Sequence, residues 1–463
     1  MIHTHLSDAA LWSGAEFFGQ DEKFSGVEID SRRVSPGSLF VALAGAHHDG
    51  HNHLDEARTR GAVAALVSRP MPTSLPLLIV EDTIHALGRL AAAWRQRFQV
   101  PVIAVLGSNG KTTVKEMIAA ILRQRYGDTV LATQGNQNNA LGVALTLFRL
   151  GPSHRAAVIE LGANGYGEIA ALSEMAKPDI AVITNAGLDH LAGFGGCEGA
   201  ARANGEVFFA MAGNGIAVLN GDDKCLDIWR KQAGDRLRIH FGFKSGVDVR
   251  GNWQRRFDGG DLTIESLWGR IQTRLHLMGH HNALNALAAA AACLALDIEP
   301  SAIAEGLASM QPVAGRLQSR LGAGGARIID DTYNANPSSL TAALDTLAAM
   351  TGKKILVLGD MAELGPDADT WHRWAGQAAR TAGVARFFAV GELARLAAES
   401  FGEGAQHLPD GQALVEALLP QLRPGVNVLV KGSRCMAMER VVADLLHPTA
   451  TELQPLFIAR KTA

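Results

Sequence analysis

The chain has 463 residues, which at roughly 150 residues per domain predicts about three domains. A net charge of −3 and a pI near 6.6 remove the electrostatic argument for nucleic acid or an anionic membrane as a partner. Apolar residues at 47%, together with 50 glycines and few aromatic residues, favour α/β layers with tight strand-to-helix turns.

Neither the first residues nor the cysteines suggest export. The start, MIHTHLSDAALW, lacks the basic residues and apolar core of a signal peptide, and no stretch reaches the roughly 18 uninterrupted apolar residues of a membrane span. The cysteines lie far apart, with no CxxC pair and no zinc-like spacing, so we expect reduced thiols and a cytoplasmic location. They are Cys197, Cys225, Cys293 and Cys435.

The first 83 residues predict a small α/β domain. Apolar runs at 27–30, 38–43 and 62–67 indicate strands, and Pro36-Gly37 and Asp49-Gly50 indicate the turns between them. A helix that leads into the next domain is predicted from apolar residues on one face, at Leu87, Leu90, Ala91, Trp94 and Phe98.

The central part of the chain alternates strands and helices. The runs at 102–106, 157–161 and 180–184 are continuously aliphatic, which is typical of parallel strands buried on both faces. A more polar, hairpin-like stretch follows at 236–277, and an alanine-rich helix is predicted at 282–296. This pattern predicts a parallel sheet covered by helices.

A third block resembles another open α/β sheet. Strands are predicted at 327–330, 354–358, 386–390 and 426–430, with helices between them. Asn336-Pro337 predicts a helix start, because asparagine caps a helix well and proline suits the first turn. The three predicted domains are 1–83, 84–313 and 314–463.

A glycine-rich loop joins the strand at 102–106 to a predicted helix. It consists of Gly107, Ser108, Asn109, Gly110, Lys111, Thr112 and Thr113. Glycines at such a turn let backbone N–H groups converge on phosphate, while Lys111 reaches the outer phosphates and Thr112 ligates Mg²⁺. The full GxxxxGK[ST] pattern needs glycine where this chain has Val105, so the loop is the shorter GxxGKTT form. The alternative is an ordinary glycine turn.

Glu160 and His190 follow two of the predicted buried strands. Their side chains would project from the carboxyl edge of the sheet, where open sheets bind ligands, and Glu160 is a natural Mg²⁺ ligand. Each also has an ordinary interpretation, as a solvated strand end or a structural histidine. The case for His190 depends on its sharing that edge with Glu160 and the loop.

Taken together, these motifs resemble the Mur ligases. AVLGSNGKTTVKEM is similar to the ATP loop of that family, IELGANGYGEI to its glutamate strand, ITNAGLDHL to its histidine segment and GHHNALNALAA to its asparagine-rich helix start. Three stretches favour the MurF type: DSRRVSPGSLFVALAGAHHDGHNH, QGNQNNALGVALTL, and IIDDTYNANPSSL with VLGDMAELG. The DNPR-type segment expected of the enzyme that adds the third peptide residue is missing.

The resemblance implies three α/β domains: a small UDP-substrate domain, a central P-loop domain with a parallel sheet, and a Rossmann-like C-terminal domain that binds the incoming dipeptide. It implies a ligase that uses ATP and Mg²⁺ to add D-alanyl-D-alanine to a UDP-N-acetylmuramoyl-tripeptide through an acyl phosphate. A monomer is expected. Two alternatives stay open, a related ligase with another amino-acid choice and a P-loop ATPase switch without ligase activity.

The resemblance also implies roles for individual residues. Lys111, Glu160, His190 and Asn204 would be catalytic, and Thr112, Glu160 and His190 would hold metal. The nucleotide contacts beyond the loop would be Asn282, Arg316 and Asp331. The uridine nucleotide would contact Ser31 and Arg32, and the peptide and dipeptide would contact Asn138, Asn139, Tyr333, Asn334, Asn336 and Ser338. Lys431 is a further candidate, whose alternative is a solvated charge at a helix start.

One position departs from the family pattern. Where the family usually has AKGE, with a lysine that becomes carbamylated and holds a second Mg²⁺, this chain has asparagine at Asn204. The neutral amide oxygen of Asn204 is a poorer ligand for a hard cation than a carbamate. We therefore expect the second metal either to be held by Glu160, His190, water and substrate, with aid from Glu206, or to bind more weakly.

Overall fold

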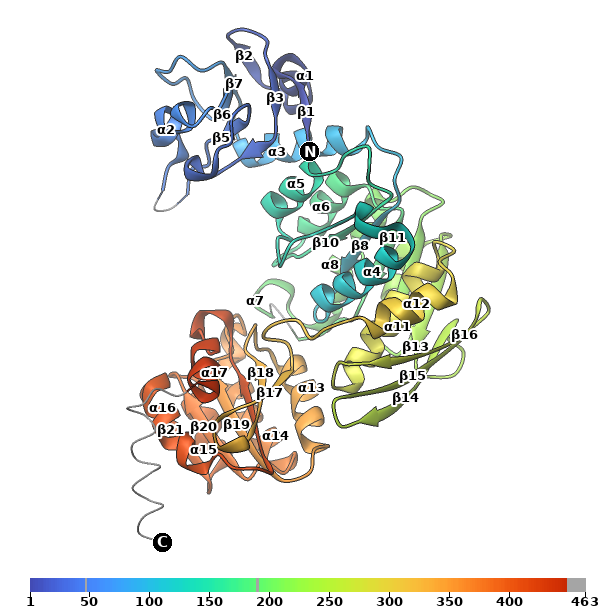
Figure 1. Cartoon of the computed structure of the whole chain (residues 1–463), viewed down its shortest axis with the longest axis vertical. Helices are drawn as coiled ribbons and strands as arrows, with labels where there is room; N and C mark the ends of the chain where they lie inside the picture. The colour runs from blue at the N-terminus through green and yellow to red at the C-terminus, as the bar shows by residue number, and fades with distance from the viewer. Residues whose placement is uncertain (46–47, 189–190, 448–463) are drawn as a thin grey trace.

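The computed structural model describes residues 1–45, 48–188 and 191–447. Three α/β regions follow one another along the chain. The first and the third lie at opposite ends of the molecule, and the second lies between them (Figure 1). The predicted three-domain α/β fold is thus confirmed. The domain boundaries at 83/84 and 313/314 fall between the sheets and stay predictions.

The first region contains a short antiparallel pair, β1–β3, and a five-stranded sheet in the order β2-β7-β6-β5-β4. Its elements are β1 (His3–His5), α1 (Leu6–Ser13), β2 (Glu16–Phe18), β3 (Lys23–Ser25), β4 (Val27–Glu28), β5 (Leu39–Val41), α2 (Leu54–Thr59), β6 (Ala64–Val67) and β7 (Leu77–Ile79). The strand predicted at 27–30 ends early because the Asp30 carboxylate accepts from the backbone N–H of Arg32 and starts a 3₁₀ turn.

Helix α3 (Thr83–Arg95) leads into the second region. The Asp82 carboxylate caps its start by accepting from the backbone N–H groups of residues 84 and 85. The predicted apolar face is buried at Leu87, Leu90, Ala91 and Trp94, but the helix ends before Phe98. The Trp94 indole N–H donates to the carbonyl of Leu150 at 3.0 Å, which ties this helix to the central domain.

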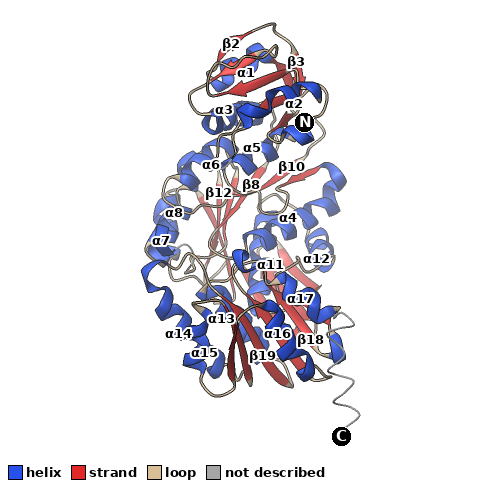
Figure 2. Cartoon of the chain, turned by 90° about the vertical axis from the view of Figure 1, so that its left-hand side faces the viewer, coloured by secondary structure: helices blue, strands red, loops and turns tan. Residues whose placement is uncertain are grey.

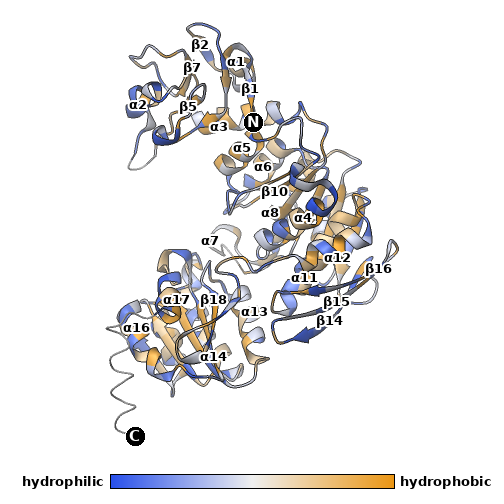
Figure 3. Cartoon of the chain, viewed as in Figure 1, coloured by the Kyte–Doolittle hydropathy of each residue, from blue (hydrophilic) through white to orange (hydrophobic). Residues whose placement is uncertain are grey.

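The central region has a nine-stranded sheet in the order β16-β15-β14-β13-β12-β11-β8-β10-β9. Its strands are β8 (Val102–Leu106), β9 (Val130–Ala132), β10 (Ala156–Glu160), β11 (Ile180–Ile183), β12 (Ile216–Asn220), β13 (Leu237–Gly242), β14 (Val249–Arg256), β15 (Gly259–Ser266) and β16 (Gly269–Leu275). The strands from β9 to β14 pair in parallel, and β14, β15 and β16 pair antiparallel. Figure 3 shows hydrophilic colour along β14 and β15, in agreement with the polar hairpin predicted there.

Helices cover both faces of the central sheet. They are α4 (Lys111–Tyr126), α5 (Ala140–Phe148), α6 (Glu168–Ala176), α7 (Leu191–Phe194), α8 (Cys197–Asn204), α9 (Val207–Ala210), α10 (Leu226–Ala233), α11 (His280–Leu294) and α12 (Pro300–Ala308). Along β8, Ile103 and Val105 pack with α4, α11 and α12, whereas Val102, Ala104 and Leu106 pack with α3, α5 and α6. The strands β8, β10 and β11 are therefore buried on both faces, as their aliphatic runs predicted.

The third region has a six-stranded sheet in the order β17-β18-β22-β19-β20-β21, parallel except for the edge strand β17. Its elements are β17 (Gln318–Leu321), β18 (Arg327–Asp331), α13 (Pro337–Ala348), β19 (Lys353–Gly359), α14 (Ala368–Thr381), β20 (Arg386–Val390), α15 (Ala394–Phe401), β21 (Ala405–Leu408), α16 (Gly411–Leu418), β22 (Val426–Lys431) and α17 (Glu439–Leu446). Figure 2 shows α14 and α15 on one face and α16 and α17 on the other. The four strands predicted here are confirmed, and Asn336 caps α13 as predicted. No helix among the described residues is long and apolar enough to cross a membrane.

Candidate active site

The glycine loop connects β8, in the middle of the central sheet, to the start of α4. Gly107 and Gly110 have φ angles of +125° and +83°, which L side chains rarely adopt. A side chain would also collide, since a Cβ at Gly107 would clash with the Thr184 hydroxyl and one at Gly110 would lie 2.5 Å from Asn285 Oδ1. Both positions therefore require glycine.

The start of α4 is available to an anion. No side chain caps this helix, so its first backbone N–H groups and the positive end of its dipole lie beside the loop. Asn185 holds the loop from below: its Oδ1 accepts from Asn109 N at 3.0 Å, and its amide donates to Asn109 O at 2.9 Å. Lys111 Nζ donates to the carbonyls of Gly107 and Ser108, at 2.6 and 3.0 Å, and these weak partners can be exchanged for phosphate oxygens.

Glu160, at the end of β10, is 1% exposed and lies beside the loop. Its Oε1 accepts from the Thr112 hydroxyl at 3.1 Å and from the Asn138 amide at 2.8 Å. Its Oε2 is buried and has no partner among the residues that the structure describes. A buried carboxylate oxygen without a donor is costly, and a cation would relieve that cost.

A magnesium ion fits this arrangement. In the described ranges no three His, Cys, Asp or Glu side chains converge as a metal site by themselves, so such an ion would need further ligands from phosphate and water. The unpartnered Glu160 Oε2 and the adjacent Thr112 hydroxyl are hard oxygen donors of the type Mg²⁺ prefers. His190, the other predicted ligand, lies outside the described residues.

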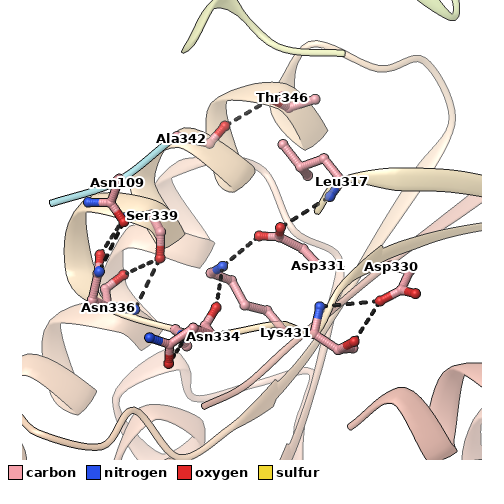
Figure 4. A network of polar contacts seen from close by, with 12 residues as sticks. Asn109, Leu317, Asp330, Asp331, Asn334, Asn336, Ser339, Ala342, Thr346 and Lys431 are labelled. Atoms are coloured by element: carbon pink, nitrogen blue, oxygen red, sulfur yellow. Dashed lines mark hydrogen bonds and ion pairs between the residues drawn. The ribbon is translucent and has the colours of Figure 1, made fainter. Parts of the chain in front are cut away.

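The third domain contacts the loop directly. Arg316 Nη2 donates to the Thr112 hydroxyl at 3.0 Å, and its guanidinium lies over the Tyr333 ring at 4.1 Å from the centroid. The Asn336 amide donates to Asn109 Oδ1 at 3.1 Å, as Figure 4 shows. These contacts join residues more than 200 positions apart and place the 331–338 segment opposite the phosphate loop.

An ion pair between Lys431 and Asp331 helps to hold the 331–338 segment in place. Lys431 Nζ donates to Asp331 Oδ2 at 2.5 Å and to the carbonyl of Asn334 at 2.9 Å, while the backbone N–H of Leu317 donates to Asp331 Oδ1 (Figure 4). The Lys431 side chain is only 2% exposed. The alternative of a solvated charge at position 431 is therefore wrong, because the ammonium is buried in a bonded pair at the end of β22.

One cavity of about 700 Å³ joins these parts. From the central domain, the predicted site residues that line it are Ser108, Asn109, Gly110, Lys111, Thr112, Thr113, Asn138, Asn139, Glu160 and Asn282. From the third domain they are Arg316, Asp331, Tyr333, Asn334, Asn336, Ser338 and Lys431. The structure thus brings together most of the residues that were singled out at separate places along the sequence, from 108 to 431.

Ser31 and Arg32 lie apart from this cavity, in the first domain. The Ser31 hydroxyl donates to Glu56 at 2.7 Å, and Arg32 pairs with the neighbouring Asp30 at 2.8 Å. Arg32 holds the pKa of the Asp30 carboxyl down, at about 2. Neither residue is brought to the phosphate loop, so their role in binding a uridine nucleotide stays a prediction.

Asn204 does not line the cavity either. It is buried at the end of α8, and its amide donates to the carbonyl of Ala200 in the same helix at 2.7 Å. Glu206 is also engaged elsewhere: its carboxylate accepts from the backbone N–H groups of Gly167 and Ala170 at the start of α6. Both side chains therefore bond to helix backbone here, and neither bonds to Glu160.

Among the polar residues of the site that had not been identified from the sequence are Asn185 and Asn285. Asn185 holds the loop as described, and Asn285 lies under Gly110, where its amide donates to Asn282 Oδ1 at 3.1 Å. A signal for Asn285 was present, because residues three apart on a helix share a face with Asn282. Asn185 carries no comparable pattern, since it is simply the second residue after β11.

His281 also lines the cavity, and burial lowers the pKa of its imidazole from 6.5 to about 4. Asp331 opposes this shift, whereas Lys431 and His280 add to it. Between pH 4 and 6.5 the His281 imidazole binds a proton in the unfolded chain but not in the folded chain. The free energy of unfolding should therefore fall as the pH drops through this window. Unfolding free energies measured across this pH window should become less pH-dependent in His281→Gln than in the wild type, and an unchanged slope would contradict the prediction.

Comparison with known proteins agrees with this architecture. A family model described as the Mur ligase middle domain matches residues 105–293, one for the Mur ligase glutamate ligase domain matches 315–434, and one for the Mur ligase family catalytic domain matches 23–95. The UDP-N-acetylmuramoyl-tripeptide–D-alanyl-D-alanine ligase of Escherichia coli K12 is 42% identical over 96% of this chain and 99% of its own length. The Bacillus subtilis enzyme of the same name is 34% identical over 91% and 93%.

Solved structures match as well. A crystal structure of MurF from Acinetobacter baumannii superposes with a TM-score of 0.91 at 33% identity, covering 96% of this chain and 99% of that one. MurF ligase from Thermotoga maritima in complex with ADP gives a TM-score of 0.83 at 28% identity, covering 93% and 98%. With its phosphate loop, its three α/β domains and relatives that match across nearly all of its length, the chain belongs to the Mur ligase family.

Proposed function

We propose that the chain joins D-alanyl-D-alanine to a UDP-N-acetylmuramoyl-tripeptide and converts ATP to ADP and phosphate as it does so. The names of its relatives, at up to 42% identity over nearly the whole chain, support this assignment. The observation that carries it is the single cavity in which the phosphate loop faces the 331–338 segment of the third domain. A nucleotide on one wall and an amine substrate on the other can meet there.

The chemistry requires an activated acyl group, because an amine cannot displace oxide from a carboxylate. A carboxylate oxygen of the tripeptide forms a bond to the γ-phosphorus of ATP, and ADP leaves. The amine nitrogen of the dipeptide then attacks the acyl carbon, loses a proton, and phosphate departs from the tetrahedral intermediate. Most of the gain in such phosphoryl transfers comes from positioning the reactants and neutralising charge.

The residues of the loop supply much of that neutralisation. Lys111 can exchange its two carbonyl partners for phosphate oxygens, and the uncapped start of α4 offers its N–H groups to the same anion. Thr112, Glu160 and His190 would hold Mg²⁺, which when bound further neutralises the phosphates. The orphaned Oε2 of Glu160 supports this assignment.

The other wall would hold the remaining substrate groups. Asn282, Arg316 and Asp331 are proposed to contact the nucleotide, which the position of Arg316 against the Thr112 hydroxyl supports. The dipeptide and the acceptor peptide would contact the polar residues on both rims of the cavity. These are Asn138, Asn139, Tyr333, Asn334, Asn336 and Ser338.

The predictions of a monomer and of a cytoplasmic location extend this proposal. One chain supplies both the phosphate loop and the facing segment of the third domain, which supports catalysis by a single copy. The substrates, a nucleotide-linked peptide and ATP, are of the kind found inside cells. Rates measured with acceptor tripeptides that end in diaminopimelate or in lysine would identify the third residue of the peptide.

Substrate omission tests the proposal. ADP release, followed in a coupled assay, should require both the UDP-muramyl-tripeptide and D-alanyl-D-alanine, and should fall to background when either is left out. A panel of single amino acids and other dipeptides should give background rates as well. ADP release without the dipeptide would indicate an ATPase switch, and release with another amino acid would indicate a ligase of different specificity.

A further inference from the structure

Lys115 is a buried cation that the proposed reaction does not use. It lies on α4, one turn after Lys111, and its side chain is fully buried. Lysine is almost never fully buried unless it is paired. All three ammonium donors of Lys115 find acceptors: Glu116 Oε1 at 2.5 Å, the carbonyl of Thr133 at 2.7 Å and the carbonyl of Gly135 at 3.3 Å.

Two of these acceptors lie in the segment 133–139, which joins β9 to α5. The far end of this segment forms part of the cavity wall, through Asn136, Asn138 and Asn139. Backbone bonds hold the ends of this connection, from Thr133 N–H to the carbonyl of Val158 and from Gly162 N–H to the carbonyl of Asn138, but the connection forms no sheet or helix of its own. The bonds from Lys115 to two main-chain carbonyls therefore anchor the segment to the helix that carries the phosphate loop.

The same segment holds Glu160 at two points. The backbone N–H of Glu160 donates to the Thr133 hydroxyl at 3.0 Å, and the Asn138 amide donates to Glu160 Oε1 at 2.8 Å. Lys115 is bonded to the carbonyl of Thr133, so a short chain of contacts runs from the buried ammonium to the carboxylate. These contacts occupy Oε1, whereas Oε2 has no partner within the described ranges.

We propose that Lys115 is a positioning residue for Glu160: it fixes the 133–139 segment so that Asn138 holds one carboxylate oxygen and the other is presented to a divalent cation. This inference rests on the proposed metal role of Glu160 and goes beyond it. Partners that orient a ligand from behind typically change metal affinity about 10- to 100-fold when they are lost. Lys115 would act through the segment, without touching substrate.

Nucleotide binding measured by calorimetry tests this directly. For the wild type, ADP should bind more tightly with Mg²⁺ than with EDTA. In Lys115→Met, affinity for ADP in EDTA should be kept, whereas the gain that Mg²⁺ provides should shrink by about 10-fold or more. The Mg²⁺ concentration for half-maximal ADP release should rise by a similar factor. A matched control is Lys354→Met, which removes a lysine bonded to the carbonyl of Ala348 in the third domain.

A double-mutant cycle shows whether Lys115 acts through Asn138. Once Asn138→Ala has removed the bond to Glu160, adding Lys115→Met should change the Mg²⁺ effect by less than about twofold, because coupled residues are not additive. The proposal would be overturned if Lys115→Met reduced the gain in ADP affinity from Mg²⁺ as strongly in the Asn138→Ala background as in the wild type. It would also be overturned by a folded Lys115→Met variant with wild-type Mg²⁺ dependence. If the methionine variant does not fold, Lys115→Gln replaces it, and failure of both to fold would mean that the role is purely structural. The calorimetry measures ADP binding alone and needs no dipeptide, so it tests the role of Lys115. The proposed ligase reaction is tested separately, by ADP release from the wild type in the coupled assay.

Discussion

Glu160→Gln is expected to lose at least about 10²- to 10³-fold of the dipeptide-dependent ADP release, as is common when one group that stabilises transition-state charge is removed. The glutamine can keep the bonds that Oε1 accepts from Thr112 and Asn138. Its NH₂ would then replace the unpartnered Oε2 and present a donor where a cation needs an acceptor. The loss should therefore appear in Mg²⁺-dependent nucleotide binding and turnover.

The stability of the Glu160→Gln variant should rise or stay unchanged, although its activity falls. The substitution removes a charge that is 1% exposed and that has no cationic partner among the described residues, so Glu160→Gln should melt at or above the wild-type temperature in the absence of nucleotide. Added Mg²⁺ and ADP should raise the melting temperature of the wild type and raise that of the variant much less. Glu305→Gln, on an exposed position of α12, serves as the control for a charge change alone. Wild-type turnover in Glu160→Gln would exclude the carboxylate from the metal site.

Much of this site could be predicted because it depends on local sequence. The order of strand, glycine loop and helix requires only an aliphatic run, two glycines and a helix-forming stretch, all within 102–126. Glu160 could be placed for the same reason, since the ends of parallel strands share one edge. The cap at Asn336 is also a local signal, and the structure has the complete capping box there.

What could not be predicted depends on contacts between distant segments. The burial of Lys431 depends on Asp331, which lies 100 residues away, and the burial of Lys115 depends on carbonyls that carry no sequence signature. The engagement of Glu206 by the start of α6 likewise depends on packing between helices. The sequence around a charged residue near a strand end does not distinguish a solvated side chain from one that is buried in an ion pair.

Lys431→Met should destabilise the folded chain by about 3–5 kcal/mol, the range found when one partner of a buried ion pair is removed. The substitution would leave Asp331, with a side chain only 13% exposed, as a carboxylate that has lost its cation. It would also remove the donor to the carbonyl of Asn334, at the base of the segment that lines the cavity. Denaturant-induced unfolding of the full chain measures the change.

The matched control is a second ion pair with nearly the same N–O distance, but on the surface of the protein. Arg250 and Glu265 pair at 2.6 Å across β14 and β15, close to the 2.5 Å of Lys431 and Asp331, but their side chains are 49% and 53% exposed. Arg250→Met should therefore cost less than about 1 kcal/mol, because water screens the exposed pair and replaces its partners. Equal losses in the two variants would mean that burial does not set the strength of the Lys431 pair.

A compensated variant separates stability from function at this pair. Replacing Lys431 and Asp331 together with methionine and leucine removes both charges, and such replacements of buried pairs are often neutral in stability. Most of the unfolding free energy should return in the double variant, whereas ADP release should not, since Asp331 is proposed to contact the nucleotide. If turnover returned together with stability, the pair would serve only to hold the third domain in shape, and the nucleotide contact would have to come from elsewhere in the cavity.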